Sequence, residues 1–139
     1  MLTHVLDASA IMRFLDGEAG APEVKQILQS ADDGASRAII SAVNWGEIVH
    51  NLIKRHGLAI ANQIERRLNH HALQIIPASA TRAAHAGLIK FNYKISYADS
   101  FGVELAFDSP DHILVTADYG VKPAERDIRI EFLPTKPKP

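Results

Sequence analysis

The chain has 139 residues, of which 47% are hydrophobic and 22% charged, and its net charge at pH 7 is −1. These values suit one folded domain and exclude both a wholly disordered chain and a protein that holds nucleic acid through overall positive charge. There is no cysteine, which excludes disulfides and thiolate metal sites, so any metal would bind oxygen or imidazole. Because neither a leader-like start nor an apolar run of about 18 residues is present, we expect a cytoplasmic protein without membrane association.

The first half of the chain predicts strands that alternate with helices. In chain order, the expected elements are a strand over 3–6, helices over 10–15 and 22–31, a short strand over 38–40, and helices over 44–56 and 59–70. The helix from Asn44 is the clearest, because apolar residues recur at helical spacing from Trp45 to Ile53 and the pattern stops at Gly57.

The second half continues the alternation. We expect a strand over 73–76, helices that follow Ser79 and Ser96 and run to Ile89 and Phe107, a turn at 109–111, and strands over 112–116 and 128–132. The run over 112–116 is almost continuously apolar, as in a strand covered on both faces in the middle of a sheet, whereas 128–132 alternates like an edge strand.

This order of elements indicates an α/β protein, a three-layer α/β/α sandwich with a short, mostly parallel central sheet flanked by helices. We expect a single domain over 1–133 and a flexible C-terminal tail over 134–139.

Two acidic residues come soon after predicted strands. Asp7 ends the first strand, and Asp118 follows the apolar strand over 112–116. Ligands of an open parallel sheet bind beyond the carboxyl ends of its strands, so these acids are candidates for one site. Taken singly, each could instead begin a helix or a turn, which is the commoner role of such a residue.

Two further acids lie early in predicted helices. Asp99 stands three residues after Ser96, the spacing of a capping box, yet its helix is rich in small and apolar residues, where a carboxylate needs compensation. Glu47 projects opposite the apolar stripe of its helix. A solvated side chain or a capping box with Asn44 are the structural interpretations of Glu47.

Considered together, the four acids predict a metal site. Carboxylates within a few ångströms of one another raise one another's pKa values unless a cation lies between them. Oxygen ligands without thiols select a hard divalent ion, Mg²⁺ or Mn²⁺. Such an ion activates water and stabilises the charge that builds on a phosphodiester, so the hypothesis is phosphodiester hydrolysis.

Each acid lies in a short motif. The motifs are Val5-Leu6-Asp7-Ala8-Ser9-Ala10, Asn44-Trp45-Gly46-Glu47-Ile48, Ser96-Tyr97-Ala98-Asp99-Ser100 and Val115-Thr116-Ala117-Asp118. Each is weak alone, but in order and spacing the set resembles the PIN-domain family over nearly the whole chain, particularly the VapC toxins of bacterial toxin–antitoxin pairs.

This resemblance implies a Mg²⁺- or Mn²⁺-dependent endoribonuclease that cleaves single-stranded or looped RNA and so restrains translation. It implies that Asp7 and Asp99 are the principal metal ligands. It also implies that Glu47 and Asp118 complete the catalytic pocket, where they bind the metal directly or through water and orient the attacking water.

The resemblance further implies supporting residues and partners. Ser9 and Thr116 match positions where family members place hydroxyls beside the acids, and Asn44 takes a similar supporting role. Their structural interpretations are a helix start for Ser9 and a strand residue for Thr116. A homodimer and a small VapB-type antitoxin are the implied protein partners.

Two other functions stay open. A PIN-like interaction module without nuclease activity would keep the fold, although the presence of all four acids counts against it. A phosphotransfer domain of the haloacid dehalogenase or receiver type also places an aspartate after its first strand, but its usual second acid is absent at Ala8 and Ser9. An RNA partner would need a local basic patch, for which the candidates are 54–56, 66–67, Arg82, Lys90 and Lys94.

Overall fold

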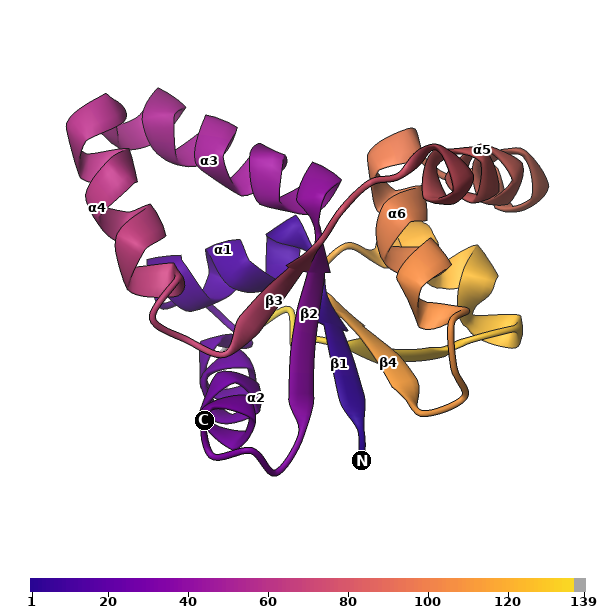
Figure 1. Ribbon diagram of the computed structural model, residues 1–139, viewed down its shortest axis with the longest axis horizontal. Coiled ribbons are helices and arrows are strands. Elements are labelled where there is room, and N and C mark those ends of the chain that lie inside the picture. The colour runs from indigo at the N-terminus through magenta and orange to yellow at the C-terminus, as the bar shows by residue number, and fades with distance from the viewer. Residues whose placement is uncertain (137–139) are drawn as a thin grey trace.

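The computed structural model describes residues 1–136, in which five short strands alternate with helices (Figure 1). The elements are β1 (Thr3–Leu6), α1 (Ala8–Asp16), α2 (Ala21–Asp32), β2 (Arg37–Ser41), α3 (Ala42–His56), α4 (Leu58–Leu68), β3 (Leu73–Ile76), α5 (Ala80–Tyr93), α6 (Tyr97–Ala106), β4 (His112–Thr116), the 3₁₀ helix η1 (Tyr119–Arg126) and β5 (Arg129–Phe132). Each helix within residues 1–136 is too short or too polar to cross a membrane.

The five strands form one sheet in the order β3-β2-β1-β4-β5, and every neighbouring pair is parallel. The predicted α/β/α sandwich is therefore confirmed, with a sheet that is parallel throughout its described strands. β4 lies inside the sheet beside β1 and β5 lies at its edge, as their apolar patterns predicted.

Side chains on the two faces of the sheet belong to two apolar clusters. Successive residues of a strand point to opposite faces, so Leu6 packs with α1 to α4 while Val5 packs with α5 and α6. In β4, Val115 and Leu114 divide in the same way. Both strands at the centre of the fold are thus covered on both faces, which fixes the positions of the residues that follow them.

Most expected boundaries lie within a few residues of those observed, and two expectations need correction. The helix expected from Asn44 begins earlier, because Ser41 ends β2 and also caps α3, its Oγ accepting from the Val43 N–H at 3.2 Å. The turn-rich segment after Asp118 was not predicted to be helical but forms η1. Part of the expected tail, residues 137–139, lies outside the described residues.

Candidate active site

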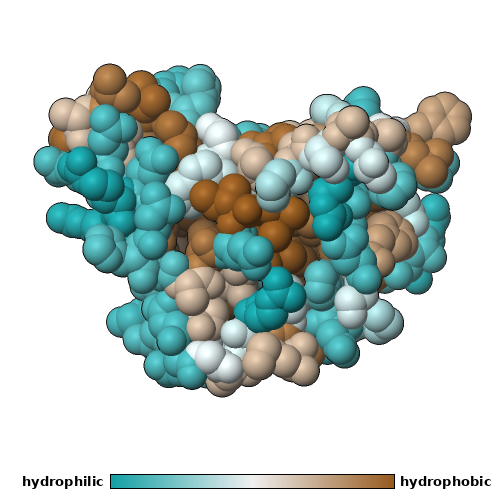
Figure 2. All heavy atoms as spheres, in the orientation of Figure 1, coloured by the Kyte–Doolittle hydropathy of each residue, from teal (hydrophilic) through white to brown (hydrophobic). Residues whose placement is uncertain are grey.

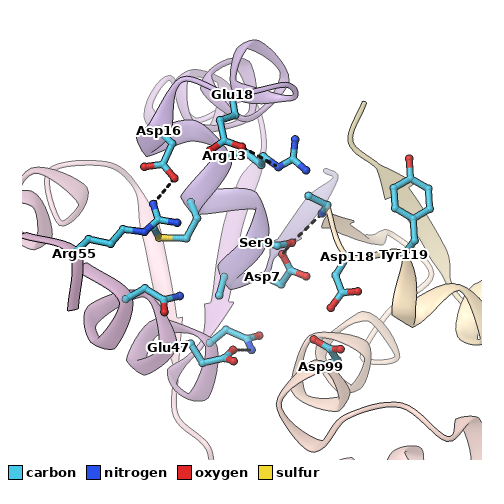
Figure 3. A pocket seen from close by; sticks show the side chains of 15 residues that line it. Asp7, Ser9, Arg13, Asp16, Glu18, Glu47, Arg55, Asp99, Asp118 and Tyr119 are labelled. Carbon is cyan, nitrogen blue, oxygen red and sulfur yellow. Dashed lines mark hydrogen bonds and ion pairs between the residues drawn. The ribbon is translucent and has the colours of Figure 1, made fainter. Parts of the chain in front are cut away.

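A groove of about 490 Å³ opens beyond the carboxyl ends of β1 and β4 (Figure 3). All four predicted acids line it, as do Ser9 and Asn44, while Thr116 is fully buried. The complete lining is Asp7, Ala8, Ser9, Met12, Arg13, Asp16, Glu18, Asn44, Glu47, Asn51, Arg55, Asp99, Ala117, Asp118 and Tyr119. Chain segments separated by up to about a hundred residues therefore meet at the point that the strand ends predicted.

Asp7 lies between β1 and α1 and is only 6% exposed. Its Oδ1 accepts hydrogen bonds from the Ser9 hydroxyl at 2.7 Å and the Ala10 N–H at 3.0 Å, and its Oδ2 accepts one from the Thr116 hydroxyl. Burial raises the pKa of Asp7, these three donors lower it, and Asp118 raises it further. Asp7 also caps α1, so its structural role and its place in the site coexist.

Asp118 is fixed by the loop that follows β4. Its Oδ1 accepts from the Gly120 N–H at 2.8 Å, which caps η1, and its own N–H donates to Thr116 Oγ1 at 2.9 Å. The Ser9 hydroxyl accepts from the Ala117 N–H at 2.9 Å. The two hydroxyls therefore join the segment after β1 to the segment after β4.

Asp99 stands in the first turn of α6, where the Ser96 hydroxyl accepts its backbone N–H at 3.1 Å. The predicted cap at Ser96 is thus present, while the Asp99 carboxylate faces Asp118 across the groove (Figure 3). Burial raises the pKa of Asp99 to about 6, with further upward contributions from Asp118 and Asp7. A carboxyl with such a pKa is partly protonated near neutral pH in the absence of a nearby cation.

Glu47 projects into the groove from α3 and does not form a capping box with Asn44. Asn44 lies inside the helix, and its Nδ2 donates to Glu47 Oε1 at 2.9 Å and to the Ala98 carbonyl at 3.1 Å. Asn44 is 1% exposed, and its Oδ1 is buried without a hydrogen-bond partner among the described residues. Asn44 therefore links α3 to the start of α6 and orients Glu47.

The chemistry of this donor set fits a hard divalent cation, because the lining holds six carboxylates and no histidine. Asp118 raises the pKa values of both Asp7 and Asp99, which is the repulsion that a cation would relieve. Within residues 1–136, however, no three acidic or histidine side chains are already placed to hold an ion together. The acids form an open set that would have to close around a metal.

The site includes residues that the sequence reasoning missed. Arg13, Asp16, Glu18 and Asn51 also line the groove, as does Arg55, which belongs to the basic-patch candidate 54–56 but was not placed beside the acids. A signal for most of them was present: positions 9, 12, 13 and 16 share one face of α1, and positions 47, 51 and 55 share one face of α3. Helical spacing counted outward from Ser9 and Glu47 would have found them.

One candidate for the basic patch is already engaged within the fold. Arg82 contacts Glu104 and Asp108, with its Nη1 2.8 Å from Glu104 Oε1 and its Nη2 2.8 Å from Asp108 Oδ2. Glu104 is 4% exposed, so this arginine compensates a buried charge between α5 and α6. Arg82 is therefore not available as a simple phosphate contact.

Comparison with known proteins gives one family and a group of similar folds. The PIN domain family model matches residues 4–125. The chain is similar to a DNA-bound VapBC structure from Salmonella typhimurium, with 18% identity, a TM-score of 0.71, and coverage of 95% of this chain and 98% of that one. VapBC2 from Rickettsia felis, bound to a promoter DNA fragment, gives 16% identity, a TM-score of 0.70, and coverage of 94% and 98%.

A toxin–antitoxin complex from Klebsiella pneumoniae matches with 20% identity, a TM-score of 0.63, and coverage of 84% of this chain and 87% of that one. At such identities the likeness establishes the fold alone. No curated protein sequence matches the chain significantly.

Proposed function

Since this chain belongs to the PIN domain family, we propose that it is a Mg²⁺- or Mn²⁺-dependent endoribonuclease that acts as the toxin of a toxin–antitoxin pair. The observation that carries the proposal is the gathering of Asp7, Asp99 and Asp118 at the carboxyl ends of β1 and β4, with raised pKa values for the first two. Clustered carboxylates with such pKa values are typical of functional sites.

In this proposal Asp7 and Asp99 hold the ion, and Asp118 and Glu47 bind it directly or through water. When bound, the ion would supply an activated water and stabilise charge on the phosphodiester. Hydrolysis then joins the water oxygen to phosphorus as a phosphorus–oxygen ester bond breaks.

The remaining polar groups support these acids. The Ser9 and Thr116 hydroxyls orient Asp7 and favour its ionised form against the opposing effect of burial, and Asn44 orients Glu47. We propose that this chemistry belongs to one nuclease domain over 1–133.

Protein partners form part of the proposal. The similar structures include VapBC assemblies and a toxin–antitoxin complex, which supports a VapB-type antitoxin as the partner of this chain. Large apolar side chains stand exposed on two surfaces, one on α3 and α4 and the other on α5 (Figure 2). They are Ile53, Leu58 and Ile60 on the first surface and Leu88 and Phe91 on the second. We propose that protein contacts cover these surfaces, including those of a homodimer, in the cytoplasm where the RNA substrate resides.

The alternative is a PIN-like interaction module without nuclease activity. The observation that favours it is the open arrangement of the acids, since no three of the described acidic or histidine side chains are placed to hold an ion. Metal binding distinguishes the two functions, because the nuclease requires its acids to bind Mg²⁺ and an interaction module does not.

Purified variants test the nuclease proposal directly. We expect Asp7→Asn and Asp99→Asn to lower Mn²⁺- or Mg²⁺-dependent cleavage of single-stranded RNA by at least about 100-fold, because loss of a direct ligand should cost no less than loss of a supporting group. Asp33→Asn, at the exposed C-terminal end of α2, is the matched control and should cleave normally. Equal cleavage by the control and both site variants would contradict the proposal.

Expression without an antitoxin tests the toxin role. Wild type should arrest growth, and Asp7→Asn and Asp99→Asn should relieve the arrest at matched protein levels. Arrest of the same depth by all three proteins would exclude a toxin that acts through this site.

A further inference from the structure

The end of the groove away from Asp99 and Asp118 carries two charged pairs (Figure 3). Arg55 from the last turn of α3 places its Nη1 2.6 Å from Asp16 Oδ2 at the end of α1. Arg13 lies beside them, with its Nε 3.9 Å from Glu18 Oε2. These two guanidiniums are the positive groups of the groove lining.

The groove connects this end to the proposed catalytic acids. Glu47 and Arg55 lie eight residues apart on one face of α3, and Asn51 stands between them. Eight residues of α-helix span about 12 Å. A short single-stranded segment lying along this face would therefore reach both ends of the groove.

Charge makes the two arginines important for an anionic substrate. Six carboxylates but only two guanidiniums line the groove, so an RNA backbone meets a negative surface. The proposed ion would offset this repulsion only around the acids that bind it. Away from the ion, phosphates have just the arginine end as a cationic contact.

The ion pair between Arg55 and Asp16 is exposed enough for a phosphate to take the place of Asp16. The Arg55 side chain is 50% exposed and that of Asp16 is 23% exposed, and ion pairs as exposed as this contribute little to stability. A guanidinium is permanently charged and offers paired donors that match two phosphate oxygens. A phosphate can therefore replace Asp16 at Arg55 at small energetic cost.

We propose that Arg55 binds a backbone phosphate of single-stranded RNA next to the cleaved segment, and that Asp16 occupies this guanidinium as an internal competitor when RNA is absent. This inference rests on the proposed nuclease function. It makes Arg55 a substrate-binding residue and Asp16 a residue that weakens substrate binding.

A purely structural role for the pair makes a different prediction. If Asp16 and Arg55 only fasten α1 to α3, removal of either side chain loosens the groove and weakens RNA binding. If Asp16 competes with phosphate, the two substitutions act in opposite directions. The sign of the Asp16 effect therefore decides between the two roles.

Binding of a fluorescent single-stranded RNA, measured by anisotropy in the inactive Asp99→Asn background with Mg²⁺ present, tests the proposal. We expect Arg55→Ala to weaken binding about three- to tenfold and to reduce the slope of log affinity against log salt by about 0.7, the loss of one phosphate contact. We expect Asp16→Asn to tighten binding about two- to fivefold, the worth of an exposed pair. The control Arg129→Ala removes an exposed arginine paired in the sheet with Ile113, near the opposite end of the strands, and should change neither quantity.

The double variant shows whether Asp16 acts through Arg55. Asp16→Asn should leave RNA affinity unchanged once Arg55 is alanine, whereas a general effect of removing negative charge would still tighten binding in that background. In the active protein, Arg55→Ala should raise KM for RNA and leave kcat close to wild type.

Several results would overturn the proposal. These are an unchanged salt slope in Arg55→Ala, weaker binding by Asp16→Asn with a lowered thermal midpoint, or an Asp16 effect that persists without Arg55. Wild-type cleavage, assayed in parallel, separates this failure from that of the proposed function. Cleavage with no Arg55 effect rejects only the phosphate contact, and absence of cleavage rejects both.

Discussion

At Asp7, a carboxylate that is 6% exposed is held by hydrogen bonds from two hydroxyls and one backbone N–H. Burial favours its neutral form and these donors favour its charged form, so the pKa reflects two opposing effects. Asp118 adds to the raised pKa. Asp7 therefore caps helix α1 and is also repelled by Asp118, a repulsion that a bound cation would relieve.

Removal of the Thr116 hydroxyl should disturb Asp7 directly. Thr116→Val keeps the shape of a fully buried residue but leaves Asp7 Oδ2 and the Asp118 N–H without this partner, which should cost about 1–3 kcal/mol of unfolding free energy. The pKa of Asp7 should rise further, so the acidic limb of the pH–rate profile should move to higher pH. Thr116→Ser keeps the hydroxyl, so its unfolding free energy and its pH–rate profile should both lie close to those of the wild type. Urea unfolding measures the first quantity, and RNA cleavage across pH measures the second. A valine variant with wild-type stability and pH profile would contradict this role.

Asp99 should make stability depend on pH. The pKa of Asp99 is about 6 in the folded chain, whereas the ordinary value expected in the unfolded chain is 3.8. At a pH between these two values, the folded chain holds a proton that the unfolded chain has released. The stability from this proton is fully present below the lower value and is lost as pH rises through the upper one. In chelator, wild type should therefore lose more thermal stability than Asp99→Asn between about pH 4.5 and pH 7.5. Equal losses would show that Asp99 does not titrate in this way.

Mg²⁺ should reverse the loss, because it binds the ionised acids. At ten times its Kd it should add about 1.4 kcal/mol, or about 5 °C in Tm, near pH 7.5 and much less near pH 5. Asp99→Asn should show little shift at either pH. An identical shift at both pH values in wild type would place the ion elsewhere.

Single residues differ in how far sequence predicts their roles. Asp7 and Asp118 could be paired from strand ends alone, because parallel strands bring their carboxyl ends to one edge. Glu47 and Asp99 each also fitted an ordinary place on a helix, so their assignment to the site depended on the combination of the four acids and on the family resemblance. The alternative interpretation of Glu47, a capping box with Asn44, does not apply, because Ser41 at the end of β2 occupies the cap of α3. The metal-binding roles of these acids stay predictions.

At the scale of elements, the close approach of α6 to the sheet positions Asp99. At Gly102, a Cβ would lie 3.1 Å from Leu114 Cδ1, 3.7 Å from Asn44 Oδ1 and 3.9 Å from Asp7 Cβ. Glycine at this position therefore allows α6 to pack closely against β4, beside Asp7 and Asn44 in the groove lining. A helix held this close carries Asp99 in its first turn.

Two glycine substitutions should separate helix propensity from this packing. Gly87 lies within α5 and has open space where a Cβ would extend, so Gly87→Ala should raise the unfolding free energy by about 0.5–1 kcal/mol. Gly102→Ala gains the same helix propensity, but its methyl group crowds Leu114. This crowding should lower the unfolding free energy by about 1–3 kcal/mol and so cancel or exceed the gain from propensity. It should also weaken Mg²⁺ binding, which titration monitored by Tm would detect. Equal stabilisation by both substitutions would show that α6 has room to move.

Local signals explain which elements could be predicted. Ser79 and Ser96 cap α5 and α6 as expected, because a cap depends on a few adjacent residues. The 3₁₀ helix η1 was missed because Gly120 and Pro123 indicate a loop. The Asp118 cap holds η1 instead, together with the burial of Val121 and Ala124 in the apolar cluster that includes Val5 and Leu114.

At the scale of the whole molecule, sheet order determines where the groove forms. From β1 the chain adds β2 and β3 on one side and then β4 and β5 on the other. The resulting switch between β1 and β4 is where open α/β sheets bind ligands. Alternation of strands and helices predicted the layers, but the strand order needed coordinates, because several parallel orders satisfy the same pattern.

The exposed face of α5 should mediate the proposed homodimer. Phe91 is 80% exposed and Leu88 is 59% exposed, and a stable dimer would need to bury about 800 Å² on each partner around them. Wild type should therefore elute with twice the 15.2 kDa mass of the chain in light scattering, and Phe91→Glu should elute as a monomer, because a charge is costly in an apolar interface. Leu58→Glu, the same kind of change on α4, should remain dimeric. Neither residue lines the groove, so a wild-type protein that is monomeric yet cleaves RNA would refute the dimer and leave the nuclease proposal intact.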